Sequence, residues 1–290
     1  ASGVPGLRIS EQLEVKLEQQ WLGQLPDEAL TALLQAEIQR PFDLAAGPLI
    51  RVKLYQVDAD EHLLLLTLHH IVSDGWSMGI MVRECIALYN HHAKGAPLPL
   101  FAALPVQYAD YASWQRERLG EGQMEDQLGY WKARLEDDFS VLQLPADRPR
   151  PAVQSYRGGR LDIHLPAALT AGLRQLAVAG NATLFHVFLP PFALLLARYT
   201  ASGRSNIGGP MTNRNRLELE GLTGFFVNTL VFRLEVDYST SFEQLLAQTK
   251  EASLQAQANK DVPFDALVEA LQPERGLGHN PLFQVMYNHL

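Results

Sequence analysis

The chain has 290 residues, of which 47% are hydrophobic and 19% charged, so it has the composition of a folded globular protein and a length that predicts about two lobes. Its formal net charge is −8, which argues against nucleic acid or an anionic membrane as a partner, because both favour a basic face. No stretch of 18 apolar residues occurs, so no membrane span is expected.

Hydrophobic periodicity in the first half of the chain predicts a mixture of strands and helices. Strands are expected at 13–20, 48–58 and 62–70, and helices at 26–40, 76–92, 106–119 and 125–136. Pro26 and Asp27 suit the first turn of the first helix, and Pro41 ends it. The strand at 62–70, HLLLLTLHH, is expected to be fully buried because its apolar run is continuous.

The composition changes in the stretch LQLPADRPRPAVQSYRGGR (142–160), which is rich in proline and glycine. Such a stretch is typical of a linker between two compact halves. We therefore predict an N-terminal lobe at 1–145, a linker at 146–158 and a C-terminal lobe at 159–290.

The second half again mixes strands and helices. Strands are expected at 160–165, around 205–211, at 226–236 and at 283–288, and helices at 166–180, 183–200 and 241–258 and after Pro263. Pro190 and Pro191 are expected to interrupt or kink the helix at 183–200. Both halves therefore favour an α/β (α+β) fold, with mixed sheets flanked by helices.

Cys85 is the single cysteine, so neither an internal disulfide nor a CxxC metal pattern can form. A chain with one free thiol suits a reducing compartment, and we expect a cytoplasmic protein. Cys85 lies in the apolar run GIMVRECIALY, which predicts a small core residue.

Polar residues follow the apolar run in LLLLTLHHIVSDGWS (63–77). On a strand, His69 and His70 would point to opposite faces, so they could not easily share a metal, and no metal site is expected. One histidine could face a cleft while the other faces the core, and Asp74 could fix the loop across a tight turn allowed by Gly75. Two hydrogen-bonded histidines at a strand end, with no chemical role, are the alternative at this point.

The stretch HHIVSDG (69–75) resembles the HHxxxDG signature of the condensation domains of non-ribosomal peptide synthetases, within the chloramphenicol-acetyltransferase-like superfamily. Further motifs of that family follow in its order, namely YADYASW (108–114), GFFVNTLVFR (224–233), NKDVPFDAL (259–267) and HNPLFQVMY (279–287). PFDLAAGPLIR (41–51) also fits the family's run before the histidine motif. Asn259 and Lys260 stand where the family prefers His and Gln.

Two N-terminal motifs of the family, similar to SxAQxRLWxL and RHExLRTxF, have no counterpart in this sequence. The resemblance therefore leads us to expect a truncated first lobe.

The resemblance implies two chloramphenicol-acetyltransferase-like lobes in a V shape, with HHIVSDG in the middle of a tunnel between them. It implies a domain that joins a donor acyl or peptidyl thioester to the amine of an acceptor aminoacyl thioester. Both substrates would be carried on the phosphopantetheine of peptidyl carrier proteins, next to adenylation domains of the same megasynthase. No cofactor is expected to be bound by the domain itself.

The same resemblance implies roles for the residues of the histidine motif. His70 would accept the proton that leaves the amine, either as a true base or as an orienting hydrogen-bond acceptor. His69 would act mainly through structure. Asp74 would hold the loop through an ion pair with an arginine of the second half, either Arg214 or Arg216.

Gly75 would leave room for the phosphopantetheine arm and lend its backbone N–H to the tetrahedral oxyanion. Asn228 interrupts an apolar strand, and a buried amide must be hydrogen-bonded, so it is expected to anchor a loop. The aromatic residues of YADYASW are expected to lie in a core, and NPLFQVMY is expected to form a final strand.

Two alternative functions stay open. An epimerisation domain of the same family typically continues VDxxSWR after the histidines, whereas this chain reads VSDGWSMGI. A non-catalytic module that only docks carrier proteins is the second alternative. A heterocyclising relative is excluded, because it has aspartates in place of the histidines.

Overall fold

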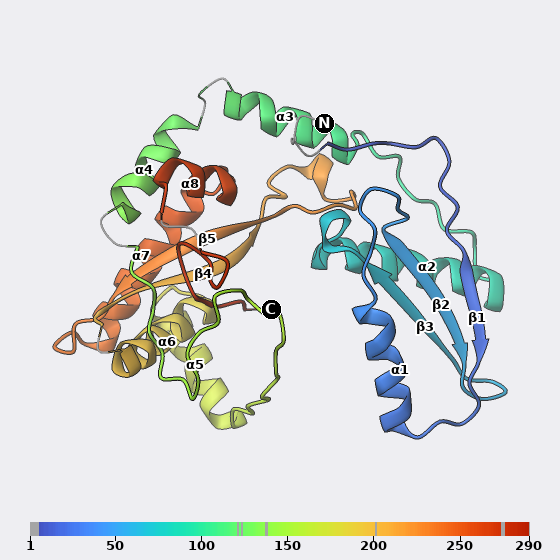
Figure 1. Cartoon of the computed structure of the whole chain (residues 1–290), viewed down its shortest axis with the longest axis horizontal. Coiled ribbons are helices and arrows are strands. Elements are labelled where there is room, and N and C mark those ends of the chain that lie inside the picture. The colour runs from blue at the N-terminus through green and yellow to red at the C-terminus, as the bar shows by residue number, and fades with distance from the viewer. Residues whose placement is uncertain are drawn as a thin grey trace. The chain divides into compact units, whose positions relative to one another are not determined.

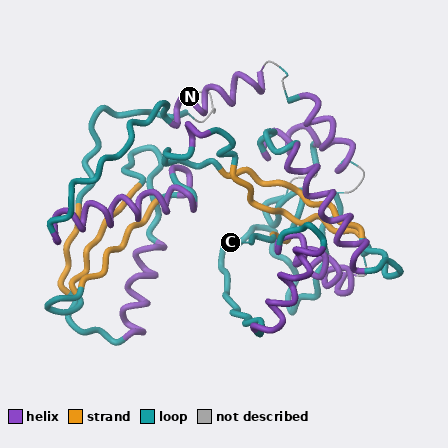
Figure 2. Tube along the Cα trace, turned by 180° about the vertical axis from the view of Figure 1, so that it is seen from behind, coloured by secondary structure: helices purple, strands orange, loops and turns teal. Residues whose placement is uncertain are grey.

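The computed structural model describes residues 6–120, 122, 124–136, 139–200, 202–273 and 276–289. Its residues fall into two compact units, the first made of Ala1–Trp114 with Arg214–Phe226, the second of Gln115–Asn213 with Val227–Leu290. Each unit has its own three-stranded sheet, and no strand is shared between the two within the described residues (Figure 2).

The two units do not coincide with the predicted lobes 1–145 and 159–290. The boundary lies near residue 114, because Trp131 and Leu135 of the following helix are buried in the core of the second unit. The segment 146–158 contains no helix or strand, as expected of a linker, but it also belongs to the second unit. There, the Gln154 N–H donates to the Leu277 carbonyl.

The sheet of the first unit has the order β1-β2-β3 (Figure 1). Its strands are β1 (Leu17–Trp21), β2 (Ile50–Gln56) and β3 (His62–Leu68). Strand β1 runs parallel to β2, and β3 runs antiparallel to it, so that Ile50 lies opposite Leu68 at the end of β3 that leads to the histidines.

The helices of the first unit lie close to the predicted ranges. They are α1 (Asp27–Gln39), α2 (Gly75–Lys94), the 3₁₀ turn η1 (His70–Val72) and α3 (Tyr108–Gly120), within which the boundary between the units falls. Glu37 of α1 forms ion pairs with Arg51 (3.1 Å) and Lys53 (2.9 Å) of β2 and so joins the helix to the sheet.

The second unit is built on the sheet β5-β4-β6, made of β4 (Arg204–Thr212), β5 (Val227–Glu235) and β6 (Val285–Met286). Its helices are α4 (Glu125–Leu135), α5 (Ala167–Ala179), α6 (Leu184–Thr200), α7 (Phe242–Ala258) and α8 (Phe264–Leu271). Figure 1 shows α4 and α8 on one side of β4 and β5, with α5 and α6 on the other. Leu189, Trp131 and Phe232 belong to the buried cluster formed between these layers.

Two expectations about strands were wrong. Strand β3 is not fully buried: it is an edge strand of its sheet, and its Leu64 is 53% exposed. The predicted strand at 160–165 has no strand partner in the described part of the chain, and Leu161 and Ile163 are exposed. Alternating apolar residues cannot form a strand where no neighbouring strand supplies hydrogen bonds.

The structure also corrects two expectations about single residues, namely the interruption of a helix by prolines and the burial of Cys85. Helix α6 is not interrupted at Pro190 and Pro191. Burial of Val187, Leu189 and Ala193 in the unit's interior offsets the backbone hydrogen bonds lost at the prolines. Cys85 is exposed rather than buried, because α2 turns its fully buried side, which includes Ile80, away from it.

Within the described residues, no single helix is long and apolar enough to cross a membrane. Helices α5 and α6 pass that test of length and composition only as a pair, with a bend of 108° between them.

Candidate functional site

The two histidines of the motif lie where β3 gives way to η1, and not on the strand itself. Strand β3 ends at Leu68, His69 is the N-cap of η1, and His70 is its first residue. The prediction that the two histidines point to opposite faces of a strand is therefore wrong, because neither histidine lies on the strand. Their surroundings nevertheless differ, since His69 is half-buried and His70 is exposed.

Hydrogen bonds fix which nitrogen of His70 carries the proton in the neutral ring. The His70 Nδ1 lies 2.6 Å from the Ser73 carbonyl oxygen. A carbonyl oxygen can only accept, so Nδ1 must carry the hydrogen. The Nε2 of neutral His70 is then left with a lone pair, on an exposed side chain.

His69 has the opposite arrangement. Its Nδ1 accepts the Ile71 backbone N–H at 3.0 Å, so the hydrogen of the neutral ring lies on Nε2. The His69 ring meets Phe42 edge-on, with centroids 6.0 Å apart. The local backbone thus makes His69 an N-cap and leaves His70 as the histidine with a free basic nitrogen.

Asp74 caps helix α2 and is the centre of a buried hydrogen-bond network. Its carboxylate accepts the backbone N–H of Ser77 (2.8 Å), the Ser77 hydroxyl (2.7 Å) and the Phe226 N–H (3.1 Å). Arg214 Nη2 lies 3.2 Å from the carboxylate, with the Arg214 and Asp74 side chains 1% and 2% exposed. Removing a carboxylate from water is costly unless it is paired and hydrogen-bonded, and here it is both.

The same surroundings keep Asp74 ionised. Burial alone would raise its pKa, but the two hydrogen bonds from Ser77, the one from Phe226 and the charge of Arg214 outweigh burial. The net result is an Asp74 pKa below the ordinary value for aspartate. Asp74 is thus a fixed negative charge and a structural anchor.

Of the two predicted arginine partners, the structure brings Arg214 to Asp74. Arg214 also donates to the carbonyls of Leu219 (2.6 Å) and Leu222 (2.8 Å), which fixes the loop that carries it. Arg216 instead lies over the Trp114 ring, at 4.9 Å from its centroid.

Gly75 is the first residue of α2, directly after the Asp74 cap. Its φ is not in the left-handed region, so the backbone at this position does not depend on glycine. A Cβ built there would meet no atom within 4 Å, so the space beside it is open. By its place in the first turn, the Gly75 N–H has no acceptor within the helix.

Asn228 is in the second unit and anchors a loop, as predicted. Its amide nitrogen donates to the carbonyls of Lys260 (2.8 Å) and Val262 (2.7 Å), and its oxygen accepts the N–H groups of Thr229 and Phe264. Asn228 therefore joins β5 to the start of α8.

Sequence reasoning missed Ser77, whose side chain is fully buried. Its oxygen accepts from Arg214 Nη2 (2.8 Å) and from the Gly224 N–H (3.0 Å), and it lies 2.9 Å from the Gly224 carbonyl oxygen. The hydroxyl has one hydrogen, so it donates either to Asp74 or to Gly224 at any one time. The available signal was the position of Ser77, three residues after an N-cap aspartate, where the residue that donates its backbone N–H to the cap is expected.

The aromatic residues of YADYASW form a small core in the first unit, as expected. Tyr111 is buried against Leu222 and Phe226, and Tyr108 and Trp114 pack around them. In the second unit, the predicted final strand is reduced to β6, which pairs in parallel with β4.

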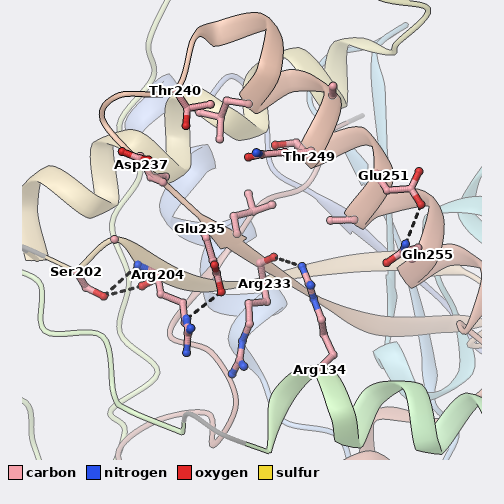
Figure 3. Close-up of a pocket in the computed structure, with 17 residues that line it drawn as sticks. Arg134, Ser202, Arg204, Arg233, Glu235, Asp237, Thr240, Thr249, Glu251 and Gln255 are labelled. Atoms are coloured by element: carbon pink, nitrogen blue, oxygen red, sulfur yellow. Dashed lines mark hydrogen bonds and ion pairs between the residues drawn. The ribbon is translucent and has the colours of Figure 1, made fainter.

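A separate pocket of about 1100 Å³ lies in the second unit between β4, β5 and α7 (Figure 3). Arg134 donates to the Arg233 carbonyl there, and Arg204 pairs with Glu235. None of the predicted site residues lines this pocket. In the described ranges no three His, Cys, Asp or Glu side chains come together as a metal site would require.

The sequence matches the Condensation domain family over residues 1–289. It is 44% identical over 289 residues to the phosphinothricin tripeptide synthetase PhsC of Streptomyces viridochromogenes, with 98% of this chain and 26% of that protein aligned. It is 44% identical over 259 residues to the malpibaldin synthetase of Mortierella alpina, with 89% of this chain and 5% of that protein aligned. The chain therefore spans a minor part of these relatives.

Solved structures agree with the sequence comparison. The X-domain from teicoplanin biosynthesis superposes with a TM-score of 0.84 at 28% identity, covering 97% of this chain and 62% of that one. The four-domain non-ribosomal peptide synthetase AB3403, bound to AMP and glycine, gives 0.85 at 27% identity, covering 95% and 21%. The first condensation domain of the calcium-dependent antibiotic synthetase, at 22% identity and a TM-score of 0.72 over 95% and 62%, has the same fold.

These matches bear out the resemblance seen in the five motifs and favour condensation over epimerisation. His70, Asp74 and the network around Ser77 thus form the HHxxxDG region of a chain that belongs to the condensation-domain family of the non-ribosomal peptide synthetases.

Proposed function

We propose that this chain forms an amide bond between a donor acyl or peptidyl thioester and the amine of an acceptor aminoacyl thioester, with His70 accepting the proton. The observation that carries the proposal is the 2.6 Å contact between His70 Nδ1 and the Ser73 carbonyl oxygen. It leaves Nε2 as the basic nitrogen of an exposed imidazole. A positioned base of this kind contributes about 10²–10⁴-fold to a rate.

The reaction balances without a nucleophile from the protein. An α-amine, with a pKa of about 7.7–8.0, is partly neutral near pH 7 and can attack the thioester carbonyl carbon. Nε2 of His70 takes a proton from the amine nitrogen as the C–N bond forms. The C–S bond then breaks, and the leaving thiolate sulfur receives the proton that His70 Nε2 had taken, which restores the neutral ring.

Gly75 is proposed to stabilise the tetrahedral oxyanion. Its N–H is in the first turn of α2, where the helix dipole is positive, and open space lies beside its Cα. Asp74 does not react in this account. Its carboxylate is saturated with hydrogen bonds from Ser77 and Phe226, so it fixes the loop that carries His70 and Gly75.

The substrates are proposed to arrive on the phosphopantetheine arms of donor and acceptor peptidyl carrier proteins, next to adenylation domains of the same synthase. The multidomain nature of the relatives supports this, since the chain aligns with 26% and 5% of two of them. No cofactor bound by the domain itself is needed for the step. A cytoplasmic location belongs to the same proposal.

The test is single-turnover dipeptidyl transfer with both carrier proteins preloaded, so that loading cannot limit the rate. His70→Ala is expected to slow transfer by about 10²–10⁴-fold with little change in melting temperature, because the side chain is exposed. His69→Ala is expected to lower the melting temperature along with activity, because it removes the N-cap of η1. A His70→Ala chain that keeps most of the transfer rate would refute the catalytic assignment and leave proximity as the mechanism.

A non-catalytic docking module is the second candidate, and one comparison favours it. A teicoplanin X-domain solved in complex with OxyB superposes on this chain with a TM-score of 0.85 at 29% identity. A chain that only docks partners would bind loaded carrier proteins and give no dipeptide in the same assay.

A further inference from the structure

The turn at Gly224–Phe226 is held by the same residues that hold the HHxxxDG loop. The Gly224 N–H donates to the Ser77 hydroxyl oxygen at 3.0 Å. One residue later, the Tyr108 hydroxyl donates to the Phe225 carbonyl at 2.9 Å. These bonds come from α2 and α3, so two helices fix this short turn.

The third residue of the turn is fixed as well, since the Phe226 N–H donates to the Asp74 carboxylate at 3.1 Å. Gly224 also has no room for a side chain, because a Cβ there would lie 2.3 Å from Tyr108 Cδ2. Each of the three residues of the turn thus has a backbone group held by a side chain of α2, of α3 or of the Asp74 cap, and Phe226 is buried while the Phe225 side chain is partly exposed.

That side chain meets His70. The two ring centroids are 5.1 Å apart and the ring planes are at 87°, the edge-to-face geometry that aromatic pairs favour. Phe225 is 37% exposed, so it adds little to the core of the unit. Two contacts therefore orient the His70 ring. They are the hydrogen bond between Nδ1 and the Ser73 carbonyl and the edge-to-face contact with the Phe225 ring.

We infer that Phe225 is a positioning residue for His70, holding the imidazole in the orientation that keeps Nδ1 on the Ser73 carbonyl and Nε2 free. Without the ring, the exposed imidazole can rotate about its side-chain bonds, and the bond to Ser73 is populated less. The neutral tautomer is then no longer fixed. The catalytic meaning of this inference rests on the proposed function, but its structural content does not.

The test is the tautomer of His70, read from ¹⁵N chemical shifts of the whole 290-residue chain labelled at histidine nitrogens. The His70 signals are identified by their loss in His70→Gln. In the unsubstituted chain, above the pH at which the ring is protonated, His70 is expected to be protonated at Nδ1.

Phe225→Leu keeps an apolar side chain but removes the ring. We expect it to lower the ratio of Nδ1-protonated to Nε2-protonated His70 about 2- to 10-fold, the size of one aromatic contact. Phe242→Leu is the matched control, since Phe242 is 38% exposed, close to the value for Phe225, and lies in the second unit. Phe225→Tyr restores a ring and is expected to restore the ratio.

An unchanged ratio in Phe225→Leu would overturn the inference, as would a shift of the same size in Phe225→Tyr or in Phe242→Leu. The outcome is distinguishable from that of the proposed function, because the measurement needs no substrate. If His70→Ala abolishes dipeptide formation while Phe225→Leu leaves the tautomer unchanged, the function stands and the inference fails. If Phe225→Leu changes the tautomer ratio but the unsubstituted chain forms no dipeptide, the inference stands and the proposed function fails.

Discussion

Asp74 in the first unit and Asn228 in the second are both buried polar side chains that anchor a loop by hydrogen bonds, but the two anchors differ in charge. In the first unit, the Asp74 carboxylate meets the Arg214 guanidinium and two N–H groups. In the second, the neutral Asn228 amide makes four hydrogen bonds to backbone groups. A charged anchor is held more tightly and is costlier to leave unpaired, whereas a neutral one is insensitive to pH.

The largest expected effect comes from breaking the charged anchor. Asp74→Ala leaves the buried Arg214 without its carboxylate, which should lower the free energy of unfolding of the first unit by about 3–5 kcal/mol. Urea unfolding followed by tryptophan fluorescence measures this. If melting were unchanged while dipeptide formation was lost, Asp74 would have a direct chemical role, contrary to our account.

The neutral anchor should be weaker. Asn228→Ala leaves backbone groups such as the Lys260 carbonyl unpaired and should cost about 1–3 kcal/mol, measured by urea unfolding of the second unit. Asn228→Asp serves as the control, because a carboxylate cannot donate to the Lys260 and Val262 carbonyls. A destabilisation by Asn228→Ala as large as that by Asp74→Ala would remove the distinction between the two anchors.

Acidic pH should weaken the charged Asp74 anchor and leave the neutral Asn228 anchor unchanged. The folded pKa of Asp74 lies below its unfolded value of about 3.9, so its stabilisation is complete above that pH and is lost as the pH falls through the folded pKa. The unfolding free energy of the unsubstituted chain should therefore fall more steeply below about pH 4 than that of Asp74→Asn. Parallel pH profiles in the two chains would contradict the assigned pKa direction.

The smallest loss of stability is expected from removing the Tyr108 hydrogen bond, which lies next to the charged anchor. Tyr108→Phe removes only the hydrogen bond to the Phe225 carbonyl and should cost about 0.5–1.5 kcal/mol in thermal or urea unfolding. Tyr199→Phe is a suitable control, because Tyr199 is 61% exposed. Equal losses from the two substitutions would mean that the Tyr108 bond does not stabilise the turn.

Much of the fold was predictable, because it depends on local periodicity. Helices α1, α2 and α7 begin and end close to the residues that the sequence indicated. The buried strand and the buried Cys85 were wrong, because burial depends on which neighbours cover a face and not on the apolar run itself.

The site was predictable only in part. The motif pointed to His70 and Asp74, and Arg214 was one of two candidates. Ser77 and Phe225 were missed, because each has a partner far away in the sequence: Gly224 is 147 residues after Ser77, and Phe225 meets His70. The opposite tautomers of His69 and His70 could not be predicted from the sequence either, because they depend on the backbone of η1 rather than on residue identity.

The fold is proposed to leave Nε2 of neutral His70 as a free basic nitrogen. The ¹⁵N spectrum of the unsubstituted chain, with both motif histidines assigned, tests this most directly. We predict that neutral His70 carries its hydrogen on Nδ1 and neutral His69 on Nε2, as the contacts to Ser73 and Ile71 require. The contrary result would be His70 protonated at Nε2, which would leave it no free basic nitrogen where the amine is proposed to react.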